Sequence, residues 1–375
     1  MKKILILYAK YGGGHYSAAN SIKNYINNHY QNVETSIVDC MEYINKAVNK
    51  ISTDAYKRIT TSTPRLWKTV YYRSEKGALS KISKSTNKFM ARKLCHLVRE
   101  LSPDVIISTH MFATQMISYL KRKNKITCTL ATVLTDFAPH EQWLIGHQYG
   151  DYFFVSNDEM KNALINDFKV DERKVYTTGI PISEKFLHHF DKATVYKLFG
   201  LDSTKKTILF FGGGEFGLGK DHTVSILKSL SKHIDKYQII AISGKNKKMK
   251  DAFYDVAVQL GNPKEIKIFD YINNVPEAMS ISELVVTKPG GLTSSESLAS
   301  SLPMLIINPI PGQEEENAEF LEKSGVAIWL RQNDNIDTLI GNLLSSPMKL
   351  QEMRDCTKAI AHVDSTETIC NILKI

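Results

Sequence analysis

The sequence predicts an α/β protein made of two Rossmann-like domains, each built around a parallel β-sheet. Three observations lead to this prediction. Short, uninterrupted apolar runs recur along the chain, as expected of parallel strands that are buried on both faces. A glycine-rich turn follows the first strand of each half, at residues 12–14 and 212–219, and a helical segment follows each turn. The 375 residues are long for one hydrophobic core and fit two.

The composition excludes several classes of protein. Its hydrophobic content of 43% and charged content of 23% are ordinary for a globular protein. The five cysteines are scattered and form no CxxC pair, which indicates reduced thiols in a cytosolic protein and no disulfide framework or zinc site. The first apolar run is too short for a signal peptide, and no run reaches the roughly 20 residues that span a bilayer. We therefore expect a protein that does not cross a membrane.

One region carries most of the positive charge. The formal net charge is +9, and residues 46–99 hold fourteen Lys or Arg against two acidic residues. Interleaved Trp and Tyr side chains suit the headgroup layer of an anionic membrane, where each basic side chain contributes about 1 kcal/mol. A solvated basic helix face is the alternative, and nucleic-acid binding is disfavoured because no nucleic-acid motif accompanies the charge. The candidate acceptor or membrane contacts in this segment are Arg65, Trp67, Lys68, Tyr71 and Arg73.

The first half of the chain alternates strands and helices. The apolar run Ile4–Tyr8 is the first predicted strand, and the glycine turn after it leads through His15 into a helix. Because parallel sheets bind ligands at the carboxyl ends of their strands, polar residues at those ends are candidate site residues. Thr178–Ile182 is the predicted linker between the halves. Further strands of this half are predicted at 33–38, 103–110, 126–135 and, as the last, 152–156.

The glycine loop of the second half, residues 212–219, allows two interpretations. Gly212, Gly214 and Gly217 match the GxGxxG pattern of dinucleotide-binding proteins. Such proteins also need an acidic residue at the end of the next strand to bind the ribose, but the predicted strand 237–243 is followed by glycine and lysine. NAD and FAD are therefore disfavoured, and a loop that accommodates a nucleotide-sugar diphosphate is preferred.

A strand–turn–helix–strand unit at 284–308 predicts an anion-binding site. The strand 284–287 ends at Pro289-Gly290-Gly291, and the helix that follows has Thr, Ser and Glu in its first turn. The free N–H groups and the dipole of such a helix start attract phosphate. The remaining predicted strands of this half are 205–211, 266–269 and 304–308, and the tail after Met348 is helical.

These residues also carry a family resemblance. Residues 287–291 (TKPGG), Glu296, Pro303, residues 311–314 (PGQE) and Asn317 resemble the donor-site signature of glycosyltransferase family 28. The segments 135–137 (TDF), His140, Trp143 and 178–182 (TGIPI) resemble that family as well. Within it, the chain looks most similar to the monogalactosyldiacylglycerol synthases and the bacterial processive diacylglycerol glucosyltransferases.

The resemblance implies the GT-B architecture, in which two Rossmann-like domains face each other across a cleft. On this expectation residues 1–179 form the acceptor- and membrane-binding domain and residues 180–354 the UDP-sugar-binding domain. The helix at about 355–375 packs back on the first domain. The implied reaction is metal-free transfer, with inversion, of a hexose from UDP-glucose or UDP-galactose to the hydroxyl of diacylglycerol, giving a β-glycosyldiacylglycerol.

Inverting transfer needs a general base, and His15 is the candidate. A histidine at a helix N-terminus is kept neutral by the dipole and able to accept a proton. The alternative is that His15 only caps or packs the helix. Asp136 is a second candidate, either as the base or as the group that orients it, although a structural strand-end Asp is an alternative. His110, His140 and Trp143 are candidates for lining the acceptor side.

The resemblance also supplies candidate donor-binding residues. Glu296 matches the family's ribose-binding Glu, although a helix dipole alone would favour an acidic residue there. Lys288 is a candidate for the diphosphate or an ordinary surface lysine, and the loop after Pro311 either contacts the sugar or is solvated. The donor-site candidates are Gly14, Gly212, Gly213, Gly214, Tyr271, Ile272, Lys288, Gly290, Gly291, Leu292, Thr293, Glu296, Gln313, Glu314 and Asn317.

The predicted protein is thus an enzyme that uses a UDP-sugar as co-substrate and needs no further cofactor. Its expected partners are diacylglycerol and an anionic phospholipid surface, with no nucleic acid, and its expected place is the cytoplasmic face of the cell membrane as a peripheral protein. Two alternatives stay open. One is a related UDP-N-acetylglucosamine transferase that acts on a polyprenyl-linked cell-wall precursor or another acceptor. The other is a GT-B epimerase or sensor that binds a nucleotide sugar.

Overall fold

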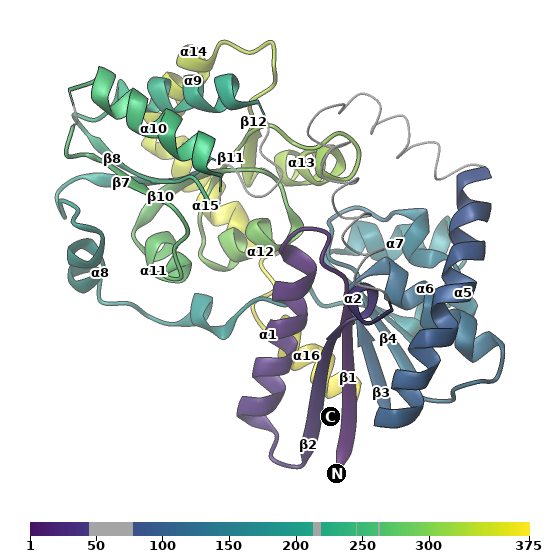
Figure 1. Ribbon diagram of the computed structural model, residues 1–375. Helices are drawn as coiled ribbons and strands as arrows, with labels where there is room; N and C mark the ends of the chain where they lie inside the picture. Colours follow the sequence, from purple (N-terminus) through teal and green to yellow (C-terminus); the bar gives the residue numbers. More distant parts are fainter. Residues whose placement is uncertain (45–77, 213–218, 245, 262) are drawn as a thin grey trace. The chain divides into compact units, whose positions relative to one another are not determined.

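A computed structural model describes residues 1–44, 78–212, 219–244, 246–261 and 263–375 and separates the chain into two compact units (Figure 1). Unit 1 comprises Met1–Glu184, Pro311–Gln313 and His362–Ile375. Unit 2 comprises Lys185–Ile310 and Glu314–Ala361. The first unit thus ends five residues later than the sequence-based boundary at residue 179, and the chain returns to it at His362.

Unit 1 contains a six-stranded sheet with the order β2-β1-β3-β4-β5-β6, and all of its strand pairs are parallel. Parallel neighbours require crossover connections, which helices provide here. The strands are β1 (Lys2–Tyr8), β2 (Val33–Asp39), β3 (Val105–Ser108), β4 (Thr129–Val133), β5 (Tyr152–Val155) and β6 (Val175–Thr177). The helices are α1 (Gly14–His29), α2 (Cys40–Ile44), α5 (Ala78–Leu101), α6 (Met111–Arg122), α7 (Asp158–Asn166) and α16 (Ser365–Ile372), with short 3₁₀ turns η1 (Glu141–Leu144) and η2 (His147–Tyr149).

Both faces of this sheet are buried, which explains the unbroken apolar run of β1. Successive side chains of a strand point to opposite faces. Leu5 and Leu7 pack in a cluster with residues of α5 and α6, whereas Ile4 and Ile6 pack with residues of α1 and α16. Figure 1 shows α1 and α16 on one side of β1 and α5 and α6 on the other. The last helix of the chain is therefore part of the core of unit 1.

A tight contact fixes the point where the chain returns to unit 1. Gly179 has a φ of +78°, and a Cβ placed there would lie 2.3 Å from the Cβ of His362. Ser365 Oγ donates a hydrogen bond of 3.0 Å to the Gly179 carbonyl. Only glycine combines this conformation with this close approach, which is a structural reason for the glycine at the second position of the TGIPI linker.

Unit 2 contains a second parallel sheet, with the order β12-β11-β10-β7-β8-β9. Its strands are β7 (Lys206–Phe211), β8 (Tyr237–Ile242), β9 (Ile266–Phe269), β10 (Ser282–Thr287), β11 (Met304–Ile306) and β12 (Ala327–Trp329). Its helices are α8 (Lys192–Phe199), α9 (Lys220–Ser231), α10 (Lys247–Gln259), α11 (Val275–Ser280), α12 (Gly291–Ala299), α13 (Gln313–Lys323), α14 (Ile336–Leu344) and α15 (Pro347–Ile360). Side chains of α9, α10, α14 and α15 form one buried cluster with Ile208 and Phe210 of β7.

The strand predictions were correct in their central parts and incomplete at the sheet edges. The predicted strand at 266–269 is β9, and the run at 284–287 lies within β10. Residues 152–156 were wrongly taken as the last strand of their half, because β6 pairs with β5 at the edge of the sheet. The three-residue strand β12 was not predicted either. An edge strand of three residues has too few positions to show a periodic pattern, so only its pairing partner identifies it.

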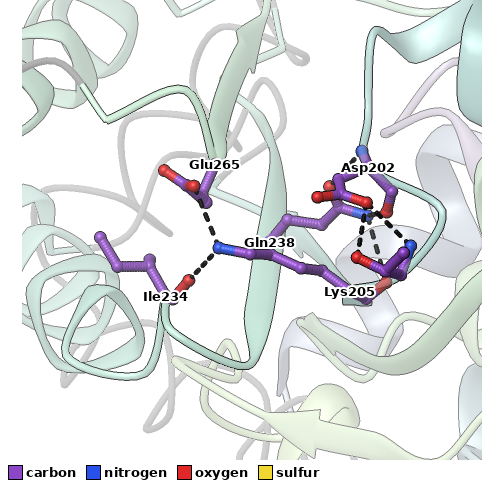
Figure 2. A network of polar contacts seen from close by, with 6 residues as sticks. Asp202, Lys205, Ile234, Gln238 and Glu265 are labelled. Carbon is purple, nitrogen blue, oxygen red and sulfur yellow. Dashed lines mark hydrogen bonds and ion pairs between the residues drawn. The ribbon is translucent and has the colours of Figure 1, made fainter.

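A polar network ties together the amino-terminal ends of three strands of unit 2 (Figure 2). Lys205 Nζ donates to the Ile234 carbonyl at 2.8 Å and to Glu265 Oε1 at 3.0 Å. The side-chain amide of Gln238 exchanges two hydrogen bonds with the backbone of Asp202, at 2.8 and 2.9 Å. The Lys205 and Glu265 side chains are 22% and 16% exposed, so the pair is largely desolvated. The network lies at the amino-terminal ends of these strands. Ligands bind at the opposite, carboxyl ends of such sheets, so the role of the network is structural.

We expect Lys205→Met to destabilise unit 2 by about 1–3 kcal/mol, because it leaves the Glu265 carboxylate and the Ile234 carbonyl without their partner. Hydrogen exchange of peptides from β7 and β8 would measure the loss separately from unit 1. Lys232→Met is the matched control, since its partner Asp337 is exposed and such pairs contribute about 0–1 kcal/mol. Equal hydrogen-exchange protection of β7 and β8 in the two variants would contradict the structural role assigned to the Lys205–Glu265 pair.

Candidate functional site

The topology of each sheet marks one position where a ligand site is expected. In unit 1 the chain runs from β1 to β2 on one side and continues from β3 on the other, so the strand order reverses between β1 and β3. In unit 2 the same reversal lies between β7 and β10. Loops at such a switch point diverge, and the space at the carboxyl ends of the two strands binds ligands in open α/β sheets. The two candidate sites are described separately below.

In unit 1, His15 follows β1 and is held by residues that follow β3 and β4. Its Nδ1 lies 2.8 Å from the Thr109 carbonyl oxygen and 2.9 Å from Thr135 Oγ1. Thr109 Oγ1 donates a hydrogen bond of 2.9 Å to the His15 carbonyl. A carbonyl oxygen only accepts, so Nδ1 carries the ring proton and donates it. The other ring nitrogen, Nε2, is then left with its lone pair available to accept a proton.

Burial keeps this imidazole neutral. Desolvation lowers the pKa of His15 from its ordinary value to about 4, and the hydrogen bond to Thr109 opposes this only in part. The ring of His110 lies 4.5 Å from that of His15, edge to face. Burial, and secondarily the neighbouring His15, hold the pKa of His110 well below its usual range. At neutral pH His15 is therefore in its base form.

His110 and His140 use one ring nitrogen to cap short helical segments. His110 Nδ1 accepts from the Phe112 N–H at 3.1 Å at the start of α6, and His140 Nδ1 accepts from the Gln142 N–H at 3.2 Å at the start of η1. Burial lowers the pKa of His140 to about 4. Both rings thus carry their proton on Nε2, the reverse of His15.

Two of the predicted acceptor-side residues, His110 and Trp143, lie beside the ring of His15. His110 and His140 are 3% and 6% exposed, and the Trp143 side chain is fully buried. The Trp143 ring lies 6.3 Å from that of His15, and its Nε1 has no hydrogen-bond partner among the described residues. A fully buried indole cannot enter a lipid headgroup layer, so Trp143 contributes to the apolar surroundings of His15, and its role in lining the acceptor side stays a prediction.

Sequence reasoning missed the two residues that orient His15. Thr109 and Thr135 each follow a buried strand, at the carboxyl ends of the strands of the sheet. This position was the sequence signal that could have identified them as site residues. Asp136, the predicted alternative, is 4% exposed, and its backbone carbonyl accepts from Ser156 Oγ at 2.6 Å. Gly14 begins α1, directly before His15.

In unit 2, the start of α12 presents free backbone donors. The capping residue Gly290 has φ −69° and ψ 139°, and no side chain caps the helix. The first N–H that bonds back within the helix is that of Ser294, to the Gly290 carbonyl at 3.0 Å. The N–H groups of Gly291, Leu292 and Thr293 are therefore among the unsatisfied donors that every helix start has. A Cβ at Gly290 would meet nothing within 4 Å, so there is open space beside these donors.

Residues from α13 hold the turn before this helix. Asn317 is 1% exposed, and its Nδ2 donates to the Pro289 carbonyl at 3.1 Å. Glu314 Oε2 accepts from the Ile310 N–H at 2.6 Å. Burial lowers the pKa of Lys288, the residue before the turn, and the nearby Glu314 carboxylate opposes this shift. Asn317 thus has a structural contact that the sequence did not predict, and its sugar contact stays a prediction, as does that of Gln313, the first residue of α13.

Glu296 lies in the second turn of α12 and is the carboxyl group most perturbed at this site. Burial raises its pKa to about 8, so it is mostly protonated at pH 7. An acidic residue that served only the helix dipole would lie in the first turn and be ionised. The dipole alternative therefore does not explain Glu296, and its contact with the ribose stays a prediction.

The remaining predicted donor residues differ in their surroundings. A Cβ at Gly212 would lie 2.0 Å from the Phe253 ring, so this glycine is required for packing. Tyr271 is 68% exposed in the loop after β9, and its neighbour Ile272 is partly buried. Gly213, Gly214 and the candidates Arg65, Trp67, Lys68, Tyr71 and Arg73 lie outside the described residues.

Two general features of the described residues concern cofactors and membranes. Within the parts of the chain that the structure describes, no group of three His, Cys, Asp or Glu side chains is arranged to hold a metal ion. The five cysteines are all free thiols. No helix among the described residues is long and apolar enough to span a bilayer.

Family models match both halves of the chain. The model for monogalactosyldiacylglycerol (MGDG) synthase matches residues 15–182, and that for the glycosyltransferase family 28 C-terminal domain matches residues 207–369. The chain is also 30% identical over 372 residues to a processive diacylglycerol beta-glucosyltransferase from Bacillus thuringiensis (strain Al Hakam). The match covers 99% of this chain and 93% of that relative.

Solved structures share the fold. A UDP-GlcNAc 2-epimerase from Neisseria meningitidis bound to UDP-GlcNAc is similar with a TM-score of 0.66 at 14% identity, over 99% of each chain. MurG from Acinetobacter baumannii is similar with a TM-score of 0.64 at 13% identity, over 100% of this chain and 99% of that one. At such low identity the likeness concerns the fold alone, and it confirms the predicted GT-B fold class.

We expect His15 to be neutral, with its proton on Nδ1, from pH 7 down to about pH 5. Nitrogen NMR of protein labelled at histidine distinguishes the two tautomers, and His110 and His140 should show the opposite one. An unfolded histidine has a pKa of about 6.5, so the unfolded state binds more protons than the folded state between about pH 6.5 and 4. Unit 1 should therefore lose stability as the pH falls through that window. Titration of His15 near pH 6.5 would contradict the burial argument.

Proposed function

This chain belongs to glycosyltransferase family 28, in the group of monogalactosyldiacylglycerol synthases and processive diacylglycerol beta-glucosyltransferases, and we propose that it glycosylates diacylglycerol. It is a glycosyltransferase. The proposed donor is UDP-glucose or UDP-galactose, and the proposed product is a β-glycosyldiacylglycerol. The observation that carries the proposal is the 30% identity over nearly the full length of both chains to a relative with that named activity.

His15 is the proposed general base. Its Nδ1–H donates to the Thr109 carbonyl, so Nε2 is the atom that takes the proton from the acceptor hydroxyl. The hydroxyl oxygen attacks the anomeric carbon as the bond from that carbon to the diphosphate oxygen breaks. The bonding electrons leave with UDP, and attack from the opposite face inverts the anomeric centre. With a pKa of about 4 the imidazole is fully in its base form at neutral pH.

The start of α12 is the proposed site of the departing diphosphate. The free N–H groups at Gly291, Leu292 and Thr293 and the positive end of the helix dipole favour a phosphate there. Lys288 precedes the turn and can add a positive charge, which a bound diphosphate would favour against the burial that lowers its pKa. Fixed donors of this kind stabilise developing negative charge without a metal ion, and we propose that this enzyme uses none.

A peripheral position at an anionic membrane surface, on its cytoplasmic side, completes the proposal. The acceptor diacylglycerol resides in the bilayer, and the basic segment 46–99 carries the charge that would attract anionic phospholipid. The last part of this segment forms the end of α5, where Arg92 and Arg99 are exposed while Leu94 and Val98 face the core. The proposed membrane position is thus supported by the charge of this segment and by the chemistry of the acceptor.

The decisive experiment incubates the full-length protein with liposomes of diacylglycerol and anionic phospholipid and with UDP-glucose, UDP-galactose or UDP-N-acetylglucosamine. We expect UDP release and a new glycolipid with one of the first two donors, dependent on diacylglycerol.

His15→Ala should reduce transfer by at least about 10²-fold and leave UDP binding intact, since a positioned base typically contributes 10²–10⁴-fold. UDP binding without any glycolipid would move the acceptor to another molecule, and full turnover by the variant would remove His15 from the mechanism.

We further expect UDP binding to be coupled to the ionisation of Glu296. A carboxylate that accepts from both ribose hydroxyls must be deprotonated, but burial holds the pKa of the free group at about 8. UDP affinity should therefore rise as the pH increases from 6 to 8, with release of a proton that calorimetry in buffers of different ionisation enthalpy detects. Glu296→Gln should weaken binding and abolish the proton release. An affinity that is equally pH-dependent in wild type and variant would refute the ribose assignment.

A further inference from the structure

Unit 2 holds a partly buried polar cluster that none of the roles above uses. His222 Nδ1 lies 2.5 Å from Asn308 Oδ1, and Asn308 Nδ2 donates to Thr223 Oγ1 at 3.1 Å. The Nε2 atom of His222 is buried and has no hydrogen-bond partner among the described residues. Asn308 has a φ of +46°, a conformation that asparagine tolerates better than most residues but that is still uncommon.

The cluster spans the carboxyl end of β10. His222 lies in the first turn of α9, the helix that follows β7, and Asn308 lies two residues after the end of β11. In the sheet, β10 lies between β7 and β11. A hydrogen bond from the helix after β7 to the loop after β11 must therefore cross the end of β10, where Lys288 and the turn into α12 begin. This is the switch point of unit 2, and the loop after Asn308 leads to Glu314.

The hydrogen bonds define the protonation of the ring. Asn308 donates through Nδ2 to Thr223, which leaves Oδ1 as the acceptor for His222. The Nδ1 of His222 must then carry the proton, and in the neutral ring Nε2 is an acceptor that lacks a donor. A buried polar atom without a partner is unfavourable, and in native structures each such atom has an explanation, such as a bound molecule or ion, local strain or a functional role.

We propose that His222 determines donor specificity by accepting, at Nε2, a hydrogen bond from a hydroxyl group of the transferred sugar. The complementary group must be a hydrogen-bond donor, which a sugar hydroxyl is and an ionised diphosphate is not. The diphosphate already has donors at the start of α12. Asn308 is a positioning residue that holds the ring in this tautomer. The inference rests on the proposed function, because it assigns a contact within the same donor site.

Two substitutions separate a sugar contact from a purely structural clamp. Asparagine reproduces the position of Nδ1, so His222→Asn retains the contact with Asn308 and lacks an atom at Nε2. Glutamine places a side-chain amide near the position of Nε2, so His222→Gln restores an acceptor there and loses the Nδ1 contact. A sugar-binding role predicts that the Gln variant is the better binder of the donor, and a structural role predicts the reverse.

The measurement is calorimetric titration of the full-length protein with UDP and, separately, with UDP-glucose and UDP-galactose. We expect His222→Asn to weaken binding of the transferred UDP-hexose three- to ten-fold, as for a neutral hydrogen bond, and to change UDP affinity less than two-fold. His222→Gln should stay within about two-fold of wild type for both ligands. If the Asn variant does not fold, the affinities of His222→Ala, which lacks both ring nitrogens, provide a second measurement of the effect of losing Nε2.

Three outcomes would overturn the inference. Equal losses for UDP and UDP-hexose would indicate a disturbed fold or a phosphate contact. Retained binding in His222→Asn with loss in His222→Gln would show that His222 only clamps the loop. No change in any variant would remove the residue from the site. Wild-type protein that binds UDP-hexose in these last cases leaves the proposed function intact, whereas wild-type protein that binds no uridine nucleotide overturns both.

Discussion

The hydrogen bond from His15 to the Thr109 carbonyl is the interaction on which the proposed chemistry depends. It joins the start of α1, the helix that follows β1, to the residue after β3, and it can form because β1 and β3 are neighbours at the point where the strand order reverses. Parallel pairing brings both carboxyl ends to the same edge of the sheet. The bond fixes the ring proton on Nδ1 and so determines which nitrogen can act as a base. Unit 2 repeats the arrangement, with the glycine loop and α12 following β7 and β10.

The candidate residues share a second property, which is that burial shifts the pKa of each toward its uncharged form. His15 is neutral because its pKa is lowered to about 4, Glu296 is largely protonated because its pKa is raised to about 8, and the pKa of Lys288 is lowered. Ionisable groups held in this way favour a change of protonation or partner when a charged or polar ligand arrives. Structural ion pairs in this protein behave differently. The hydrogen bond from Lys205 lowers the pKa of Glu265, so this carboxylate stays ionised at neutral pH.

Sequence reasoning found the central strands, the glycine turns and the helix starts because each has a local signal. A buried run, a Pro-Gly-Gly turn and a Ser- and Thr-rich helix start are readable within a few residues. It missed β6 and β12, which are short edge strands, and it missed Thr109, Thr135, His222 and Asn308. These four residues form contacts with partners that are distant in the chain. His15 and Thr109, for example, are 94 positions apart. The full burial of Trp143 was not predicted for the same reason, because it depends on packing and not on the local sequence.

The sequence alone determined the fold class, the two-domain organisation and the family, because these depend on the order of strands and turns and on motifs along the chain. It also indicated His15 and Glu296 as candidates. Only the tertiary structure decided which nitrogen of His15 is able to accept a proton, that burial raises the pKa of Glu296 and that Asn317 contacts the turn before α12. Tautomer and ionisation depend on the atoms around a side chain and on its desolvation, and those atoms come from strands that meet only when the sheet has formed.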